Sequence, residues 1–428
     1  MPEQSMNITH LSKYDRLGGA AIAAFRLHKA LNRAGAQSAM VVDMKTCDDP
    51  SVHGPASLKG MFAARNSGHL DRLPLKFYRH QGLPFHPAWA PRRLPRPLLK
   101  NADVINLHWI TGGFMSLQNV ASLAKLGKPV VWTLHDMWAF TGGCHYAGVC
   151  GKYKAACGAC PQLGSARAGD LSAKVFRRKK KAYADLNLHI VTPSGWLGNR
   201  VKDSALLSGR PVQIIPNGLD TGVFKPAEKN TARSIFNLPE DKKIILFGAA
   251  GGTSDKRKGF RYLFEAINRL KEIASGQKDY MLLIFGAGHS KGNERFPFET
   301  VFAGALSDEV SMSVLYSCAD VFVLPSLEDN LPNTIMESMA CGTPVAAFDI
   351  GGVPDMVEHM KNGFLAKYMD SEDLAQGIKW VLEDERRRQA LGEAAREKAL
   401  EDYSMDVLAK SYLTLYESIT SDRPNRKV

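Results

Sequence analysis

Two acidic side chains eight positions apart form the strongest chemical pattern in this sequence of 428 residues. Asp329 lies in a polar stretch after the apolar run that ends at Leu324, and Glu337 lies on a segment that Pro332 is expected to open as a helix. The N–H groups and the dipole at a helix start favour anionic or hydroxyl-rich ligands. Because carboxylates accept hydrogen bonds from neighbouring hydroxyls, the pattern predicts a site that binds a sugar.

Basic residues, glycines and a histidine follow other expected strands and would complete such a site. Lys258, with Arg257 beside it, would attract an anionic ligand such as a phosphate group. Gly18 and Gly19 lack a Cβ, so the backbone there can approach a diphosphate or an acceptor closely. His135 ends a strand, at the edge of a sheet where ligands bind. The alternatives are an exposed loop charge for Arg257, a tight turn for the two glycines and a strand cap for His135.

Four of the seven cysteines cluster in the sequence as Cys144, Cys150, Cys157 and Cys160. The cluster closes with a Cys-x2-Cys spacing, which is typical of a four-thiolate structural zinc site. Free thiols in a loop and disulfides are the alternatives, and a reducing cytoplasm disfavours the disulfides. The other three cysteines are scattered, and we expect them in the core or on helices.

The elements that must position these residues alternate between strand-like and helix-like segments from end to end. The strand-like runs are continuously apolar, which is typical of parallel strands covered by helices on both faces. In such doubly wound sheets ligands bind beyond the carboxyl ends of the strands. The expected strands are Asn7–Leu11, Ala39–Val42, Val104–Leu107, Val130–Leu134, Ile190–Thr192, Val212–Ile215, Ile244–Phe247, Met281–Phe285, Val301–Ala303, Val321–Leu324 and Val345–Phe348.

The length of the chain exceeds that of one ordinary domain, and the strand series restarts near Lys243 after a turn-rich stretch. We therefore predict an α/β fold with two doubly wound, Rossmann-like domains that face each other across a cleft. The first domain covers residues 1–205 and the second covers residues 206–400. A C-terminal helix at Asp406–Ile419 and a loose tail make up residues 401–428.

These motifs together resemble the signature of retaining glycosyltransferases of family 4, which have the GT-B fold. The resemblance runs from about Met6 to about Glu401, and a longer string, Trp132–Leu163, is similar to a subgroup from bacterial exopolysaccharide gene sets that includes colanic-acid-type transferases. The matching pieces, in the family's order, are Gly18-Gly19, His135-Asp136, Phe247–Gly259, Leu324–Val345 and Gly351–Asp355.

The resemblance implies a hexosyltransferase-type enzyme whose second domain binds a UDP- or GDP-sugar and whose first domain binds the acceptor. It implies that Glu337 binds the ribose hydroxyls and that Asp329 stands where the family usually has a glutamate. His135, Asp329 and Lys258 would act at the reacting sugar, and Gly18, Gly19 and Arg257 would help to bind the donor. The backbone of Asn330, Leu331, Pro332 and Asn333 would hold the sugar and the diphosphate.

The resemblance also implies the course of the reaction. The anomeric configuration is retained by a front-face substitution, and the leaving diphosphate acts as base toward the acceptor hydroxyl, so the protein supplies positioning and positive charge. No catalytic metal is expected, and the sequence has no Asp-x-Asp pair. The family's usual arginine after the first strand of the second domain is absent, so backbone amides of residues 248–254 would contribute instead. A zinc at the cysteines would fold a loop over the acceptor side.

The formal net charge of +12 is unevenly distributed, with +18 in residues 1–212 and −6 in residues 213–428. The segment Ser57–Lys100 has nine basic residues against one acidic residue, with Phe62, Leu70, Phe77 and Trp89 among them. We expect this segment to dock on an anionic membrane, where a lipid-linked oligosaccharide or polysaccharide acceptor would be met. No signal peptide and no apolar run of membrane-spanning length is evident, so we expect a cytoplasmic protein that is peripheral on the inner face of the plasma membrane.

Two other classes of function compete with this one. A nucleic-acid-binding protein would use the basic half of the chain, including Arg167–Tyr183, but no aromatic stacking motif or binding module accompanies it. Another GT-B enzyme, such as a sugar-nucleotide epimerase, would act on the donor without an acceptor. A phosphorylase would need a pyridoxal-phosphate lysine motif that we do not find.

Overall fold

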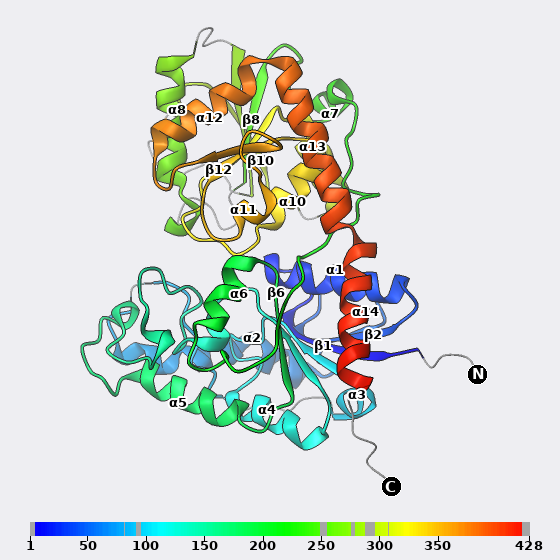
Figure 1. The fold of residues 1–428 in the computed structure, drawn as a ribbon, viewed down its shortest axis with the longest axis vertical. Coiled ribbons are helices and arrows are strands. Elements are labelled where there is room, and N and C mark those ends of the chain that lie inside the picture. Colours follow the sequence, from blue (N-terminus) through cyan, green and yellow to red (C-terminus); the bar gives the residue numbers. More distant parts are fainter. Residues whose placement is uncertain are drawn as a thin grey trace. The chain divides into compact units, whose positions relative to one another are not determined.

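The computed structural model describes residues 5–80, 82–90, 96–248, 255–274, 279–286, 296–306 and 308–421. The chain divides into two compact units, drawn in Figure 1. We call Met1–Asn217 with Asp406–Val428 the amino-terminal unit, and Gly218–Met405 the carboxy-terminal unit. The sequence analysis put the change of domain at 205/206 and set residues 401–428 apart. In the structure the change falls at Asn217/Gly218, and the terminal helix is part of the amino-terminal unit.

The amino-terminal unit is built on a parallel sheet of seven strands in the order β3-β2-β1-β4-β5-β6-β7. Its strands are β1 (Asn7–Tyr14), β2 (Gln37–Met44), β3 (Val52–His53), β4 (Val104–Leu107), β5 (Val130–Thr133), β6 (Leu188–Thr192) and β7 (Val212–Ile214). Its helices are α1 (Gly19–Arg33), α2 (Leu58–Arg72), α3 (Arg96–Asn101), α4 (Leu117–Ser122), α5 (Leu171–Tyr183), α6 (Gly195–Lys202) and α14 (Met405–Ser421).

The carboxy-terminal unit has a parallel sheet of six strands in the order β10-β9-β8-β11-β12-β13. Its strands are β8 (Lys243–Gly248), β9 (Tyr280–Phe285), β10 (Glu299–Gly304), β11 (Val321–Leu324), β12 (Val345–Phe348) and β13 (Gly363–Ala366). Its helices are α7 (Lys229–Ile235), α8 (Phe260–Ile273), α9 (Glu309–Cys318), α10 (Asn333–Ala340), α11 (Val353–Met356), α12 (Ser371–Glu383) and α13 (Glu385–Tyr403).

The predicted fold class, two doubly wound parallel sheets with helices, is confirmed. Each strand expected from the sequence lies within or overlaps a strand of the structure, and the predicted terminal helix is α14. Two edge strands were missed. β3 is a pair of residues, and β13 is a short Gly-Phe-Leu-Ala run, so neither has the length of apolar sequence by which the others could be recognised.

Burial explains why the strands are apolar throughout. In β8, Ile244 and Leu246 enter one core cluster, whereas Ile245 and Phe247 enter the cluster on the other face of the sheet. Neighbouring β11 alternates in the same way, with Phe322 in the first cluster. Because side chains of a strand point alternately to opposite faces, both faces of this sheet must be covered, as the continuous runs predicted.

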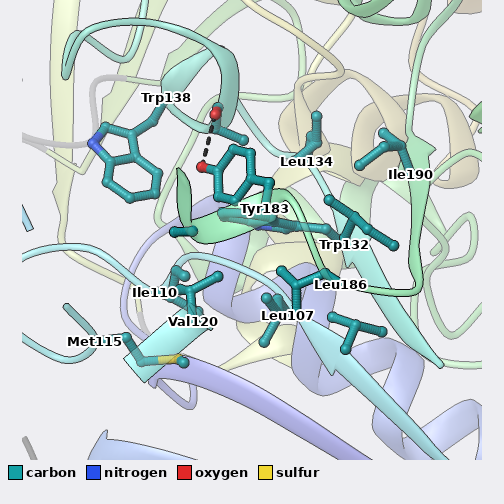
Figure 2. Packing of buried hydrophobic residues seen from close by; sticks show 14 of the residues in the cluster. Leu107, Ile110, Met115, Val120, Trp132, Leu134, Trp138, Tyr183, Leu186 and Ile190 are labelled. Atoms are coloured by element: carbon teal, nitrogen blue, oxygen red, sulfur yellow. Dashed lines mark hydrogen bonds between the residues drawn. The ribbon is translucent and has the colours of Figure 1, made fainter. Parts of the chain in front are cut away.

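The core of the amino-terminal unit is rich in aromatic side chains (Figure 2). Trp132 of β5 is 2% exposed and packs edge-to-face against Tyr183 of α5, with ring centroids 5.6 Å apart. The helix α14, red in Figure 1, is tied to this sheet by two buried tyrosines. Tyr412 Oη lies 2.9 Å from Thr133 Oγ1, and Asn106 donates to Tyr416 Oη at 2.7 Å. These bonds explain why the last helix belongs to the first unit.

Candidate functional site

The central strands of the carboxy-terminal unit bring the predicted donor residues together. β8 and β11 are neighbours in the sheet. In the sequence, the 72 residues between Gly248 and Val321, which include β9 and β10, separate the two strands. The strand order of the sheet reverses between β8 and β11. In doubly wound sheets, ligands bind beyond the carboxyl ends of the two strands at this reversal. The loop after β8 contains the short 3-10 helix η7 (Lys256–Lys258), and the loop after β11 contains residues 325–332.

These two loops are packed directly on each other. Leu327 donates its backbone N–H to the carbonyl of Arg257 at 2.7 Å. Gly259 has a φ of +68°, and a Cβ there would overlap the carbonyl oxygen of Pro325. A glycine is therefore required at 259 both for its backbone conformation and for the close approach of the second loop. These two contacts fix the position of the loop after β8 against the loop after β11.

The ion pair between Lys258 and Asp329 is the centre of the site. Lys258 Nζ lies 2.7 Å from Asp329 Oδ2, and the two side chains are 28% and 13% exposed. The other carboxylate oxygen of Asp329 accepts the N–H of Asn330 at 3.1 Å. The ammonium group has three N–H donors, so it can keep its bond to Asp329 and still present donors to an anionic ligand.

A third loop, after β12, holds Asp329 from the other side. Gly352 donates its N–H to the carbonyl of Asp329 at 3.3 Å. Gly351 has a φ of +55°, and a Cβ at this position would overlap the same carbonyl oxygen. The backbone of Asp329 is thus held by the loop after β12, and its carboxylate is held by Lys258. The neighbouring Glu328 is more exposed than Asp329, which favours Asp329 for the role that the eight-residue spacing gave it.

Glu337 lies on α10 with its side chain turned into the unit. The residue is 6% exposed, and Tyr316 of α9 donates its hydroxyl to Glu337 Oε2 at 3.1 Å. A carboxylate keeps several acceptor positions after accepting one hydrogen bond, so Glu337 can still bind hydroxyl groups. Pro332 is the N-cap of α10 rather than its first residue, and Gly342, with a φ of +73°, follows the C-cap Cys341.

Residues 330–333, whose backbone is predicted to hold the sugar and the diphosphate, offer few N–H groups. Pro332 has no N–H group, and the N–H of Asn330 is already bonded to Asp329. Leu331 is 6% exposed and belongs to a core cluster, so its side chain is not available to a ligand. Asn333 is the first residue of α10, whose N-terminus supplies a partial positive charge.

Arg257 is held beside this site by its own loop. Its Nη2 lies 2.7 Å from Asp255 Oδ2, and Asp255 also caps η7 through the N–H of Arg257. The alternative of an unattached surface charge does not describe Arg257. The predicted contribution of backbone amides at residues 249–254 lies outside the described residues.

In the amino-terminal unit, Gly18 and Gly19 lie where β1 turns into α1. Gly18 has a φ of +88° and its carbonyl accepts the first helical hydrogen bond, from Ile22 at 3.0 Å. Both glycines are exposed, and no atom lies within 4 Å of a Cβ built on Gly18. The turn itself therefore explains why a glycine stands at 18, and the open space beside it is available to a ligand.

His135 and Asp136 follow β5, and each is connected to further buried side chains. Asp136 Oδ2 accepts a hydrogen bond from His145 Nδ1 at 2.6 Å and another from Trp109 Nε1 at 3.2 Å. His145 Nε2 in turn lies 2.7 Å from His86 Nδ1. Burial alone would raise the pKa of Asp136, but His145 and the N–H of Trp138 hold it below its ordinary value. Asp136 is therefore a carboxylate that orients a histidine pair.

A second chain of imidazoles lies behind His135. His108 Nδ1 is 3.2 Å from His135 Nε2, and His108 Nε2 is 2.9 Å from His10 Nδ1. Sequence reasoning missed these partners, together with His86 and His145. Two of these histidines could have been found from their position in the sequence. His108 directly follows β4, and His145 directly follows Cys144 in the loop after β5.

The four clustered cysteines lie in the loop between β5 and α5. None of the seven cysteines forms a disulfide. Burial, with a smaller contribution from Cys157 and Cys160, raises the pKa of the Cys144 thiol to about 12, so these thiols lie within electrostatic reach of one another. Burial likewise raises the pKa of Cys157 to about 11.

The predicted zinc site gains no support from this arrangement. Within the described part of the chain, no group of three or more His, Cys, Asp or Glu side chains is placed so that it could hold a metal ion. The zinc therefore stays a prediction, and no step of the chemistry below depends on it. Metal analysis of the purified chain tests it directly, since a four-thiolate site should retain close to one zinc per chain.

One part of the predicted basic surface is buried. Lys179 of α5 is 0% exposed, lies 3.6 Å from the centre of the Trp138 ring, and donates to the carbonyls of Trp138 and Thr141. Burial lowers the pKa of Lys179 to about 7, although Cys144 and Cys157 act in the opposite direction. The run Arg177–Lys181 is therefore not a continuous charged face, because the side chain of its central residue is buried against the loop that leads to the cysteines.

Comparisons with known proteins agree with these observations. Residues 17–223 match the family model "Glycosyltransferase Family 4", and residues 228–398 match "Glycosyl transferases group 1". An uncharacterised glycosyltransferase of Methanocaldococcus jannaschii is 29% identical over 48% of this chain and 54% of its own length. The N,N'-diacetylbacillosaminyl-diphospho-undecaprenol alpha-1,3-N-acetylgalactosaminyltransferase of Campylobacter jejuni is 30% identical over 43% of this chain and 47% of its own length. The chain thus spans about half the length of these curated relatives.

Solved structures share the fold over nearly the whole chain. Sucrose-phosphate synthase from Thermosynechococcus elongatus has a TM-score of 0.64 at 19% identity, covering 98% of this chain and all of that one. Anabaena HepE, solved in complex with UDP and glucose, has a TM-score of 0.63 at 16% identity, covering 96% of this chain and all of that one. The two units therefore have the GT-B fold.

Proposed function

Because residues 17–223 and 228–398 carry a family 4 and a group 1 glycosyl transferase domain in the GT-B fold, we propose that this chain moves a sugar from a nucleotide-sugar donor to an acceptor. The transfer is of the hexosyl type and retains the anomeric configuration. The acceptor is a lipid-linked oligosaccharide or a polysaccharide made by bacteria as exopolysaccharide, capsule or lipopolysaccharide. The observation that carries the proposal is the Lys258–Asp329 pair at the carboxyl ends of β8 and β11.

The side chains of the carboxy-terminal unit suit the parts of a nucleotide sugar. Lys258 offers ammonium donors to the diphosphate while Asp329 keeps it in place. Glu337, held by Tyr316, accepts hydrogen bonds from the ribose hydroxyls. The N-terminus of α10 adds a partial positive charge near the same loop. A donor of the UDP- or GDP-sugar class satisfies all three features.

The chemical step needs charge stabilisation more than a protein nucleophile. The bond between the anomeric carbon and the diphosphate oxygen breaks, and its electron pair goes to the diphosphate. The acceptor hydroxyl oxygen bonds to the same face of that carbon, and its proton passes to a diphosphate oxygen. Lys258 stabilises the developing negative charge, and donors preorganised in this way lower barriers by several kcal/mol, about 3–4 kcal/mol for one such group.

His135 is proposed to contact the donor sugar from the amino-terminal unit. Burial lowers the pKa of His135 to about 4, although the charge of Asp136 raises it. The imidazole is therefore neutral at neutral pH, and it serves as a hydrogen-bonding group rather than as a cation. Gly18 and Gly19, at the exposed turn before α1, leave room for the donor or the acceptor.

The surface around α2 is proposed to meet the membrane. Phe62 and Phe77 are 73% and 88% exposed, and Leu70 and Trp89 are 52% and 38% exposed. Basic residues of the same segment include Lys59, Arg65, Arg72, Lys76 and Arg79. Exposed aromatic side chains among basic ones suit an anionic lipid surface. No helix among the described residues combines the length and hydropathy that a membrane crossing requires. The attachment that we propose is peripheral.

The nature of the acceptor is supported by one relative. The Campylobacter jejuni protein is named for transfer to a sugar carried on diphospho-undecaprenol. An acceptor of that class presents a lipid and a diphosphate together, which matches the mixed apolar and basic character of the α2 surface. An acceptor without a lipid would not need that surface.

The proposal is tested by incubating the purified chain with a panel of UDP- and GDP-sugars and analysing the products. We expect slow release of nucleoside diphosphate and free sugar from one donor, and faster release when an acceptor extract is added. A sugar nucleotide converted to its epimer, without release of diphosphate, would instead identify an epimerase. No reaction with any donor and tight, salt-sensitive binding of DNA would favour the nucleic-acid-binding alternative.

A further inference from the structure

Three histidines form a continuous line of hydrogen-bonded imidazoles in the amino-terminal unit. His10 belongs to β1, His108 directly follows β4, and His135 follows β5. The nitrogen–nitrogen distances are 2.9 Å between His10 and His108 and 3.2 Å between His108 and His135. The ring centroids lie 5.2 Å and 5.5 Å apart. His10 is 0% and His108 is 3% exposed, whereas His135 is partly exposed, so the line runs from the core to the surface.

All three imidazoles are neutral at neutral pH. Burial holds the pKa values of His10 and His108 well below their ordinary value, and neighbouring imidazoles lower them further. Each neutral ring carries one proton on one of its two nitrogens. In a line of such rings each hydrogen bond joins one N–H to one lone pair, so the direction of the first bond fixes the direction of the second.

The inner end of the line selects one of the two directions. His10 Nε2 is buried and has no hydrogen-bond partner in the described structure. If the protons pointed inward, this nitrogen would carry an unsatisfied N–H, and buried N–H groups without a partner are rarer than unsatisfied acceptors. If the protons point outward, His10 Nδ1–H donates to His108 Nε2, and His108 Nδ1–H donates to His135 Nε2. The outward direction leaves only a lone pair at the inner end.

We propose that His10 and His108 are positioning residues that hold His135 as the tautomer with its proton on Nδ1. His135 Nε2 is then an acceptor that faces the protein, and the Nδ1–H group is directed away from His108. This tautomer, together with the proposed function on which the inference rests, assigns His135 a role at the nucleotide sugar. Its Nδ1–H group donates a hydrogen bond to an oxygen of the transferred sugar. A proton-accepting role for His135 at the sugar is excluded by the same arrangement.

The tautomer is measured without reference to activity. In the full chain labelled with 15N-histidine, long-range 15N–1H correlation spectra distinguish an Nδ1–H ring from an Nε2–H ring, and His135→Asn identifies the His135 signals by their loss. We expect wild-type His135 to be the Nδ1–H tautomer. An Nε2–H tautomer in the wild-type chain would overturn the proposal, whatever the variants do.

The line itself is tested by His108→Phe, with His10→Phe as the second variant if the first fails to fold. Each removes the donor that fixes the next ring, so we expect the His135 signals to move toward a mixture of tautomers. An unchanged Nδ1–H signal in a folded variant would show that the line does not set the tautomer. If no transferase activity exists, these spectra still decide the proposal, so its failure is distinguishable from failure of the proposed function.

Activity provides a matched pair of variants. The amide nitrogen of an asparagine takes a place close to Nδ1 of histidine, whereas that of a glutamine reaches the place of Nε2. With an active donor, we expect His135→Asn to keep about tenfold more turnover than His135→Gln, the effect of one hydrogen bond. Equal losses, or better rescue by glutamine, would contradict an Nδ1–H donor.

Discussion

The carboxy-terminal unit buries an acidic side chain among basic ones, whereas the amino-terminal unit buries five histidines, His10, His28, His86, His108 and His145. Asp320, 1% exposed, contacts Lys229, Arg233 and Arg388 at 2.7–2.8 Å. Ten of the twelve histidines of the sequence lie in the amino-terminal unit. That unit also has a buried ion pair, Lys13–Asp43, so the contrast is one of degree.

Under the proposed function, this contrast would suit each unit to a different part of the reaction. Ion pairs keep their charges across a wide pH range and can stabilise a diphosphate. Neutral imidazoles offer directed donors and acceptors to uncharged hydroxyls, but they can acquire a proton in mild acid. The four predictions that follow test this difference, from the largest expected change in free energy to the smallest.

Removing the charge of Asp320 should cost the most. Asp320→Asn keeps the shape of the side chain but leaves Arg233 and Arg388 as buried cations, with side chains 4% and 12% exposed. Breaking a buried ion pair in this way costs about 3–5 kcal/mol. Urea unfolding followed by the fluorescence of Trp380, the one tryptophan of the carboxy-terminal unit, measures the loss. The matched control is Asp203→Asn, which breaks the exposed Lys154–Asp203 pair and should change nothing measurable.

Truncation at the proposed donor site should nearly abolish turnover without unfolding the chain. Lys258→Ala removes the charge that faces the diphosphate, and Glu337→Ala removes the ribose contact, so each should lower kcat/KM by about 100-fold or more. Steady-state release of nucleoside diphosphate is the measurement. Glu328→Ala, next to Asp329 but more exposed, is the control and should retain most activity. Near-normal rates for both site variants would remove the site assignment.

The amino-terminal unit should lose stability in mild acid more steeply than the carboxy-terminal unit. Burial lowers the pKa values of His28 and His135 to about 4, whereas an unfolded histidine titrates near 6.5. The unfolded chain binds more protons between these values, so stability is full above about pH 6.5 and falls toward pH 4. Each such histidine contributes about 1.4 kcal/mol per pH unit.

Tryptophan fluorescence can follow this loss in one unit at a time. Five of the six tryptophans lie in the amino-terminal unit, so urea unfolding of a Trp380→Phe variant reports on that unit alone. His28→Gln should flatten the pH dependence, because a glutamine amide does not titrate. A midpoint that is constant from pH 7 to pH 4.5 would mean that the histidines are not buried as neutral rings.

The smallest expected effect concerns the surface near α2. Replacing Phe62 and Phe77 by Asp removes exposed aromatic area and adds negative charge, so affinity for anionic vesicles should fall several-fold to about tenfold at low salt. Co-sedimentation with vesicles is the measurement. Ile235→Asp, at an apolar residue of the carboxy-terminal unit that is 61% exposed, is the control and should leave binding unchanged. Equal binding by all variants would assign the α2 surface another purpose.

The sequence was informative where structure is local. The apolar runs predicted the strands because the central ones, such as β4, β5 and β11, are buried along their whole length and are therefore apolar at every position. The polar stretch after Leu324 and the proline at 332 predicted a loop followed by a helix, because proline suits the start of a helix. Gly259 and Gly351 lay inside recognised motifs, but only the structure shows that each faces a carbonyl of the loop after β11.

The histidine line could not be predicted because its contacts are distant in sequence. His10 and His108 are 98 positions apart, and they meet because β1 and β4 pair in the sheet. The order of strands in a sheet is a property of the whole fold, and no spacing of residues in the sequence encodes it. Lys179 was misread for a similar reason, since its place in a basic run does not reveal that its side chain turns into the core.

The central claim is that the loops after β8 and β11 bind a nucleoside diphosphate through Lys258. Titration calorimetry of UDP and GDP against the wild-type chain, Lys258→Ala and Lys256→Ala tests it, because Lys256 is an exposed neighbour of the same charge. The account predicts that one of the two nucleotides binds, that Lys258→Ala weakens its Kd about tenfold or more, and that Lys256→Ala leaves it within about twofold. Equal affinity in all three proteins, or no binding of either nucleotide, would contradict it.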